Sequence, residues 1–180
     1  MIGNYFRKMT GTTQSPPRVS LPEILWSFLG SFLGIGAVAY INYGWLDKTD
    51  LVMIIGSFGA SAVLIYGAIK SPLAQPRNFL GGHVLSALIG VTAFKLLAPH
   101  LWLAAALAVA FSIALMHATK TLHPPGGATA LIAVISGAKV HNLGYLYVLV
   151  PVAAGALVML AVALLVNNLA PRRRYPEFWW

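Results

Sequence analysis

Two segments of this chain combine a break in an apolar run with groups that can hold a small anion. The clearer one is the heptapeptide from His123 to Thr129 (HPPGGAT), which interrupts an almost entirely apolar run between Leu101 and Leu165. Its prolines end one helix, and its glycines permit a sharp turn before the next helix starts. The first N–H groups of a helix lack partners and carry partial positive charge. Such a helix start within a membrane predicts an anion site, and therefore transport.

The residues that we expect to form this site lie in the two broken segments or in a neighbouring span. Ser61 and Thr129 offer hydroxyl groups beside the expected helix starts, and His83 and His123 offer imidazole rings that line a path. Ionisable residues within a membrane usually face the bundle interior and mark a substrate path. The full set of expected substrate-binding residues is Gly59, Ala60, Ser61, His83, His123, Gly126, Gly127, Ala128 and Thr129.

Simpler roles stay open for these side chains. The hydroxyls of Ser61 and Thr129 can bond to a carbonyl one turn earlier in their own helices, as is common in membrane helices. His123 can hold a strained turn by hydrogen bonds without touching a substrate. Lys95 lies near the end of its span, so we expect its ammonium group to extend to the membrane surface.

A second group of residues is expected to shape the site. The connection from Ser71 to Asn78 is short and bounded by prolines. Arg77 stands at the start of the next helix, where the helix dipole disfavours a positive charge. We therefore expect it to have a partner, such as a carbonyl, a lipid phosphate or the substrate, although a purely topogenic charge stays open. The expected structural residues are Pro124, Pro125, Gln75, Arg77 and Asn78.

The chain carries none of the patterns expected of an enzyme. It has no cysteine, no HExxH and no GxSxG sequence, so we expect no catalytic residue, metal site or cofactor. Glu23, Asp47 and Asp50 fall at the ends of apolar segments. This argues against a proton-driven cation carrier, because such a carrier needs a carboxylate within the membrane. The remaining polar interior is neutral or basic, which favours an anion.

Composition places these residues in a lipid bilayer. Of the 180 residues, 58% are hydrophobic and only 9% are charged, whereas soluble domains carry about 25% charged residues. The net charge of +8 lies mostly in connections and the tail, so topology explains it without a nucleic acid partner. We predict an all-α integral membrane protein with six segments: Ile24–Tyr43, Leu51–Ile69, Phe79–Ala98, Leu101–Ala118, His123–Gly137 and Leu143–Asn167. The fifth is too short for a regular span.

Basic residues predict which ends of the segments face the cytoplasm. With six crossings and a cytoplasmic N-terminus, nine Lys and Arg residues lie in inner segments and two, Lys48 and Lys139, in outer ones. This places both termini inside, whereas five crossings would put the arginine-rich tail outside. The expected parts are a polar cytoplasmic tail (1–22), two membrane halves (23–98 and 99–170) and a basic, aromatic cytoplasmic tail (171–180).

A faint internal repeat relates the two halves. The segment Gly59 to Ile65 (GASAVLI) is similar to Gly127 to Ile132 (GATALI), and each lies in the middle segment of its half. Three segments per half would invert the second half relative to the first. Interrupted segments in corresponding positions are the sequence pointer to a transporter's binding site. Chance similarity between small-residue segments stays open as the alternative.

Rows of small residues predict close helix packing. Gly30 and Gly34 form one row, and Gly82, Ser86 and Gly90 form another. Such rows let helix backbones approach closely in lipid, either within one chain or between chains. Because six short segments make a thin-walled bundle, we expect a homo-oligomer, with a dimer ahead of a trimer.

Several motifs, taken in order, resemble those of the HPP family of integral membrane proteins. They are Gly56 to Ala60, Ser71 to Asn78, Gly81-Gly82-His83, His123 to Thr129 and Arg174-Tyr175-Pro176, and the similarity runs from about Ser27 to Trp180. This family includes nitrite transporters of chloroplasts and cyanobacteria, so the resemblance implies small-anion transport and nitrite as the substrate. The chain has neither the paired CBS domains of some bacterial members nor a transit peptide, so we expect a bacterial inner membrane.

These patterns predict a transporter or channel for a small monovalent anion. The two half-helix starts, Gly59 to Ser61 and Gly126 to Thr129, would meet near the midplane and bind the anion through backbone N–H groups. One alternative is a pore for another small solute or a cation. Another is a structural or assembly subunit, in which the tail Arg172–Trp180 docks to a partner instead of anchoring at the membrane surface.

Overall fold

A computed structural model describes residues 2–180, with side chains from Tyr5 onward, so the first residue of the expected tail lies outside it. The described residues form helices and connections, with no β-strand among them. The α-helices are α1 (Ile2–Arg7), α2 (Leu21–Tyr40), α3 (Gly56–Ala62), α4 (Pro76–Leu97), α5 (Leu101–Ala118), α6 (Pro124–Ile135), α7 (Ala138–His141) and α8 (Ala154–Leu169). Turns of π-helix extend α2 (Ile41–Trp45) and α3 (Val63–Gly67) and precede α8 (Val148–Ala153). Short 3₁₀ turns lie at Pro72–Ala74 and Ala98–His100.

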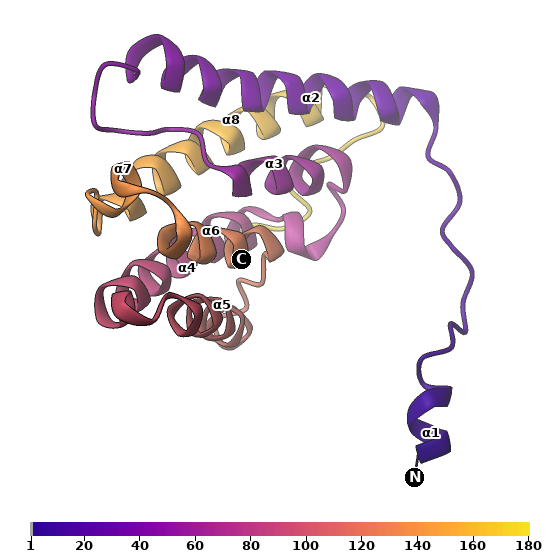
Figure 1. The fold of residues 1–180 in the computed structure, drawn as a ribbon. Helices are drawn as coiled ribbons and strands as arrows, with labels where there is room; N and C mark the ends of the chain where they lie inside the picture. Colours follow the sequence, from indigo (N-terminus) through magenta and orange to yellow (C-terminus); the bar gives the residue numbers. More distant parts are fainter. Residues whose placement is uncertain (1) are drawn as a thin grey trace.

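Three apolar helical stretches are long enough to cross a membrane: Leu21–Trp45, Pro76–Ala118 and Val148–Leu169. The second contains α4 and α5, which fold into an antiparallel hairpin at Ala98–His100 (Figure 1). Two further apolar helices are shorter, Gly56–Gly67 and Pro124–Ile135. The all-helical membrane class is therefore confirmed, while the count of six crossings and the inverted repeat stay predictions.

The second expected segment, Leu51–Ile69, is helical over only part of its length. Residues 51–55 form no helix, and Ile55 has extended backbone angles (φ −131°, ψ 150°) directly before α3. The side-chain oxygen of Asn42 accepts hydrogen bonds from the N–H groups of Met53 (2.8 Å) and Ile54 (3.3 Å). These bonds replace helical ones, because buried backbone donors need a partner. The chain therefore has two half-length helices, α3 and α6, which lie where we expected a broken segment in each half.

The long helices surround the two short ones. In Figure 1 they run roughly side by side, with α2 and α8 on one side, α3 and α6 in the middle, and α4 and α5 on the other side. Helix α4 packs against α5 and α6, and α2 packs against α8 and the second part of α3. Helices of the two expected halves are thus interleaved, and α1 lies away from the bundle (Figure 1).

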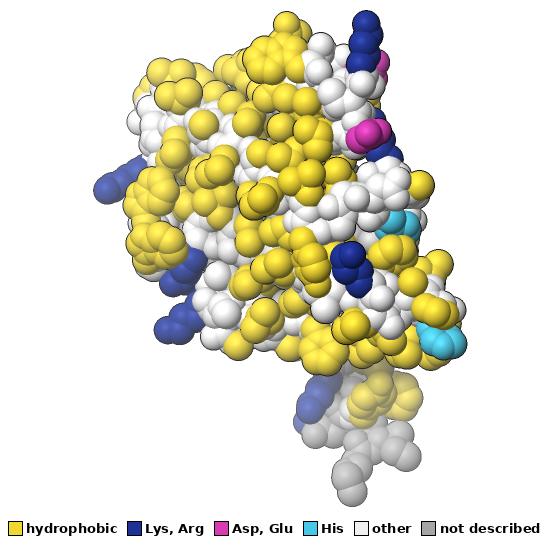
Figure 2. All heavy atoms as spheres, turned by 90° about the vertical axis from the view of Figure 1, so that its left-hand side faces the viewer, with side chains coloured by type: hydrophobic (Ala, Val, Ile, Leu, Met, Phe, Trp, Pro, Cys, Tyr) yellow, Lys and Arg dark blue, Asp and Glu magenta, His cyan; other side chains and the backbone are white. Residues whose placement is uncertain are grey.

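The outer surface is rich in hydrophobic side chains. Phe28, Phe32, Trp102, Phe111 and Leu165 are all exposed on the long helices. Figure 2, which views the end of the bundle that carries α7, shows hydrophobic side chains over most of that face, with isolated charged groups between them. A surface of this kind matches acyl chains, which make no hydrogen bonds.

One end of the bundle carries six of the twelve Lys and Arg residues of the chain. The connection between α3 and α4, the turn after α5 and the segment after α8 meet there, and Asn78 donates to the Leu122 carbonyl (2.9 Å). The basic residues of this end are Lys70, Arg77, Lys120, Arg172, Arg173 and Arg174. Three basic residues lie at the opposite end (Figure 1): Lys48 in the connection after α2, Lys95 in the last turn of α4 and Lys139 in α7. The expected charge asymmetry is therefore present, and its assignment to the cytoplasm stays a prediction.

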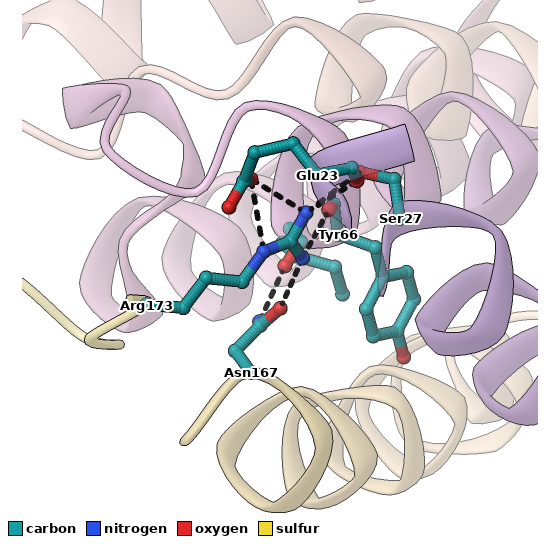
Figure 3. A network of polar contacts seen from close by, with 6 residues as sticks. Glu23, Ser27, Tyr66, Asn167 and Arg173 are labelled. Carbon is teal, nitrogen blue, oxygen red and sulfur yellow. Dashed lines mark hydrogen bonds and ion pairs between the residues drawn. The ribbon is translucent and has the colours of Figure 1, made fainter. Parts of the chain in front are cut away.

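Arg173 has a structural role that the charge pattern alone does not reveal. Its buried guanidinium donates to a carboxylate oxygen of Glu23 (3.0 Å) and to the Glu23 carbonyl (2.8 Å). It also donates to the Tyr66 carbonyl (3.0 Å), the Asn167 side-chain oxygen (3.0 Å) and the Ser27 hydroxyl (2.8 Å). Figure 3 shows these bonds converging on one side chain. Arg173 thus ties the start of α2 to the end of α3 and to α8.

The rest of the tail also packs partly on its own chain. The buried Tyr175 hydroxyl donates to the Ala74 carbonyl (2.7 Å), and the Glu177 N–H donates to the Gln75 side chain (2.8 Å). Burial raises the pKa of Tyr175, which keeps this donor protonated. Trp179 and Trp180 are exposed. Arg173 and Tyr175 are therefore not available for docking or anchoring, whereas the exposed residues of the tail are.

Both rows of small residues pack within the chain. A side chain at Gly30 or Gly34 would collide with the ring of Tyr66. At Gly82 a Cβ would lie 2.6 Å from the Cβ of His123, and at Gly90 it would meet the backbone of Ala130. These glycines let α2 approach α3, and α4 approach α6.

Gly126→Ala is expected to destabilise the protein by about 1–3 kcal/mol, because overpacking forces backbones apart. A Cβ at Gly126 would lie 2.8 Å from the carbonyl oxygen of Gly82, and backbone cannot yield as a flexible side chain can. Gly59→Ala is the matched control, since nothing lies within 4 Å of a Cβ there. Thermal unfolding in detergent compares the two variants. Equal melting temperatures would contradict the close approach of α4 and α6.

Candidate functional site

Helices α3 and α6 lie side by side and run in opposite directions. The hydroxyls of Ser57 and Thr129 are hydrogen-bonded at 2.8 Å, and the Ser61 hydroxyl lies 2.9 Å from Nε2 of His123. The start of α3 is thus beside the second turn of α6, and the start of α6 is beside the second turn of α3. The expectation that the two starts meet is wrong, because the paired side chains fix an overlapping, antiparallel register.

Five polar side chains from three helices meet between these elements, and we call them the histidine–hydroxyl cluster: Ser57, Ser61, His83, His123 and Thr129. His83 of α4 lies at the centre, with Nε2 at 2.7 Å from the Ser61 hydroxyl and Nδ1 at 2.6 Å from the Thr129 hydroxyl. Nδ1 of His123 lies 2.8 Å from the carbonyl oxygen of Leu73. All five side chains are buried, with exposed fractions of 0–1%.

Aromatic rings close the cluster on its apolar side. Phe58 and Phe79 present ring edges to His83, with centroids 5.4 Å and 5.3 Å away. Phe79 also contacts His123 at 5.3 Å, and the two imidazole centroids are 5.0 Å apart. Such surroundings strengthen hydrogen bonds and make any unpaired polar group costly.

The sequence positions His123 through the two prolines. A residue before proline is pushed away from helical geometry, and His123 is accordingly extended, with φ −143° and ψ 105°. It therefore stands just before α6, within reach of Ser61 on α3. Gly82 and Gly126 bring α4 close to α6, so that His83 reaches Thr129.

The start of α6 offers few donors to an anion. Pro124 and Pro125 have no N–H group, and the N–H of Gly126 donates to the His123 carbonyl at 2.8 Å. Gly126 is buried against α4, and Gly127 and Ala128 are half-buried. The first three positions of α6 therefore have no unpaired N–H group with which to bind an anion.

The expected residues of α3 divide between two faces. Ser61 points into the cluster, whereas Gly59 and Ala60 are exposed on the opposite face. The expectation that Gly59 and Ala60 line the same site as Ser61 is thus wrong for this arrangement, since successive helical residues point about 100° apart. Ser61, His83, His123 and Thr129 are brought together as expected.

Ser57 and Tyr147 belong to this region and were missing from the expected set. Ser57 stands four residues before Ser61 in one helix, and residues at that spacing share a face. That spacing is a signal by which the sequence could have revealed it. Tyr147 donates from its hydroxyl to the Thr129 carbonyl (3.1 Å). Nothing in the local sequence connects Tyr147 to α6.

The simpler roles expected for these side chains, bonding to a carbonyl one turn earlier or holding a turn, are only partly observed. The Thr129 hydroxyl lies 3.2 Å from the Pro125 carbonyl oxygen, one turn earlier, in addition to its bonds with His83 and Ser57. Ser61 instead bonds to the two histidine rings. His123 does lock its turn, through Leu73, while also taking part in the cluster.

The expected structural residues hold the connections at the basic end. Gln75 donates to the Ile69 carbonyl (2.9 Å) and the Ser71 carbonyl (2.8 Å). The guanidinium of Arg77 lies over the ring of Phe178, 5.7 Å from its centroid, while its buried Nε has no hydrogen-bond partner among the described residues. The expected carbonyl, lipid phosphate or substrate partner therefore stays a prediction. Lys95 is exposed at the end of α4, over the ring of Tyr145.

Comparisons with known proteins support the family resemblance. The chain matches the family model described as "HPP, transmembrane region" over residues 16–176. It is 50% identical over 179 residues to one transmembrane protein of Dictyostelium discoideum and 48% identical over 184 residues to another. These alignments cover 98% and 99% of this chain but 57% and 64% of the two relatives, so the chain spans less than two thirds of their length. No solved structure matches it.

Proposed function

Because the chain belongs to the HPP family of transmembrane proteins, we propose that it transports a small monovalent anion, most favourably nitrite. The observation that carries this proposal is the histidine–hydroxyl cluster itself. Its side chains are buried at the junction of two half-length helices, and no Asp, Glu, Lys or Arg side chain of the described residues shares its hydrogen bonds. Polar groups at such positions within a membrane are costly and commonly mark a substrate path.

The chemistry of the cluster favours an anion over a cation. Three hydroxyl groups and two imidazoles supply hydrogen-bond donors, and a carboxylate, which a cation would need, is absent from the hydrogen bonds of the cluster. Each donor contributes about 1 kcal/mol net, so several together are needed to replace the hydration of an ion. The start of α3 adds N–H groups at Gly56 and Ser57, next to the Ser57 hydroxyl.

The cluster is closed in this structure, so we propose a moving element. Ser61, His83, His123 and Thr129 have exposed fractions of 0%, and an anion reaches them only if α3 or α6 shifts relative to α4. Discontinuous helices in transporters are the elements that commonly form and open such sites. A carrier-like cycle therefore fits this arrangement better than a permanently open pore.

Orientation and assembly complete the proposal. We place the basic end of the bundle in the cytoplasm, because short cytoplasmic connections carry an excess of Lys and Arg. A second copy would pack on the exposed small residues Gly56, Gly59 and Ala60 of α3, with a dimer ahead of a trimer. Location in a bacterial inner membrane stays a prediction, since the two compared relatives come from Dictyostelium discoideum.

Thr129→Val is expected to lower nitrite uptake into proteoliposomes about tenfold or more, because it removes the hydroxyl that bonds both His83 and Ser57. Thr92→Val makes the same change outside the cluster, on α4, and should leave uptake within about twofold of the unchanged protein. Chloride, nitrate and formate serve as competitors.

Unchanged uptake in Thr129→Val would remove this residue from the site. No uptake of any anion by correctly folded protein would instead overturn the transport proposal. The favoured function would then be transport of another solute, or an assembly role that uses the exposed Trp179 and Trp180.

A further inference from the structure

The hydrogen bonds of the histidine–hydroxyl cluster constrain where its hydrogens lie. A backbone carbonyl only accepts, so the 2.8 Å contact with the Leu73 oxygen requires a hydrogen on Nδ1 of His123. In a neutral ring, Nε2 of His123 then accepts, and the Ser61 hydroxyl must donate to it. The Ser61 oxygen can in turn accept only from Nε2–H of His83.

Counting donors and acceptors in the same way also places the hydrogens at the Thr129 end of these hydrogen bonds. If His83 is neutral with its hydrogen on Nε2, then Nδ1 accepts from the Thr129 hydroxyl. Thr129 has only one hydrogen, so in this state it must turn that hydrogen away from Ser57, to which it donates in the structure at 2.8 Å. In the neutral state the hydrogens between Thr129 and Leu73 therefore all point one way, towards Leu73, and the bond that Thr129 donates to Ser57 is not kept in that direction.

The structure also contains the acceptors for one additional proton. The Thr129 hydroxyl lies within hydrogen-bond distance of the Pro125 carbonyl (3.2 Å) and of Ser57 (2.8 Å). When Thr129 turns its hydrogen to either of them, its oxygen is free to accept from Nδ1–H of His83. His83 then carries hydrogens on both nitrogens, and every contact of the cluster is kept.

Ser61 can pass this proton between the two histidines. The proton on Nε2 of His83 moves to the Ser61 oxygen, and the Ser61 hydrogen moves to Nε2 of His123, so that one N–H bond breaks as another forms. His83 becomes neutral and His123 becomes an imidazolium that donates to Ser61 and Leu73. Since Leu73 belongs to the connection between α3 and α4, this step carries the proton from the centre towards the basic end.

The groups around the two imidazole rings decide whether an imidazolium is stable in the cluster. The groups that face the two rings are Phe58 of α3, Phe79 of α4 and the hydroxyls of the cluster, and Tyr147 donates to the Thr129 carbonyl. No carboxylate of the described residues bonds to the cluster to balance an imidazolium. A buried charge without a partner is strongly unfavourable, and so is a buried anion alone.

We infer that the histidine–hydroxyl cluster binds one proton together with each anion, so that the protein moves the two as an electroneutral pair. This inference rests on the proposed anion transport. Each ion supplies the counter-charge that the other lacks in the bundle. The chain thereby performs proton-coupled transport without an intramembrane carboxylate.

The test uses the full-length protein in liposomes that contain a trapped pH indicator, with nitrite as the probe and the membrane potential clamped by potassium and valinomycin. One proton should enter per nitrite, at a rate independent of the clamped potential. An inward proton gradient of about one pH unit should drive nitrite accumulation to about tenfold, the ratio that a free energy of about 1.4 kcal/mol supports. Protein-free liposomes give the background from nitrous acid that crosses lipid unaided.

Nitrite uptake without protein-dependent proton entry, or uptake that follows the membrane potential, would overturn the inference and leave the proposed function standing. No uptake of any anion would overturn both.

Ser61→Ala interrupts the relay, and Ser112→Ala alters a buried serine of α5 outside the cluster. Coupled proton and nitrite entry should fall at least tenfold in the first variant and stay unchanged in the second. Full coupling at an unchanged rate in a folded Ser61→Ala protein would equally refute the relay.

Discussion

Arg173→Ala is expected to lower the free energy of unfolding by about 2–4 kcal/mol, because it removes a buried guanidinium and leaves its buried acceptors without a donor. The change deletes the hydrogen bonds to Glu23, Ser27, Tyr66 and Asn167 at once. It leaves the carboxylate of Glu23 without its partner at 2.8 Å. Loss of these hydrogen bonds frees the start of α2 from α3 and α8, so the melting temperature in detergent should fall steeply.

Arg174→Ala is the matched control, because Arg174 is the next residue and is exposed. It removes the same charge from the same end of the bundle, so any effect of charge on membrane insertion is common to both variants. Its melting temperature should stay close to that of the unchanged protein, since exposed substitutions change stability by about 0.5 kcal/mol or less. Similar losses in both variants would show that charge at this end, and not the hydrogen bonds of Arg173, stabilises the fold.

His83→Gln is expected to abolish most nitrite uptake, with a reduction of more than about tenfold at every pH, because two hydrogen bonds of about 1 kcal/mol each are affected. Glutamine can still offer an amide N–H and a carbonyl oxygen to Ser61 or Thr129, so the fold should survive. It cannot carry a proton at neutral pH. Uptake of nitrite by proteoliposomes at several external pH values measures this loss.

His117→Gln provides the comparison for this variant. His117 lies in the last turn of α5 and is exposed, so uptake should remain within about twofold of normal. If His83→Gln is folded by size-exclusion chromatography and transports normally, His83 has only a packing role. If it fails to fold while His117→Gln folds, nitrite uptake by Ser61→Ala and Thr129→Val still tests the cluster, because each of those changes removes one hydroxyl group.

Arg173 and the cluster illustrate two uses of buried polar groups in one bundle. Arg173 meets an acidic partner and closes the basic end, so its bonds hold helices together. The histidine–hydroxyl cluster contains no charged partner, so its bonds can be rearranged by moving hydrogens alone. This difference explains why we expect the Arg173 variant to change stability first and the His83 variant to change transport first.

The sequence by itself determined the class of the protein and most members of its central site. Long apolar runs require a membrane, because lipid cannot satisfy exposed backbone groups. The prolines at 124 and 125 mark the start of a half-length helix, since proline cannot continue the preceding one. Polar residues within apolar segments identified Ser61, His83, His123 and Thr129, because such residues are expensive to bury without a partner.

Tertiary structure alone decided how these parts meet. The antiparallel overlap of α3 and α6 depends on contacts between residues 62 and 72 positions apart, and Arg173 finds Glu23 across 150 positions. Local sequence sets where a helix starts and which residues share its face, but not which other helix covers that face. For this reason Gly59 and Ala60 point outward, the two helix starts lie apart, and an arginine predicted to set topology holds three segments of the bundle together.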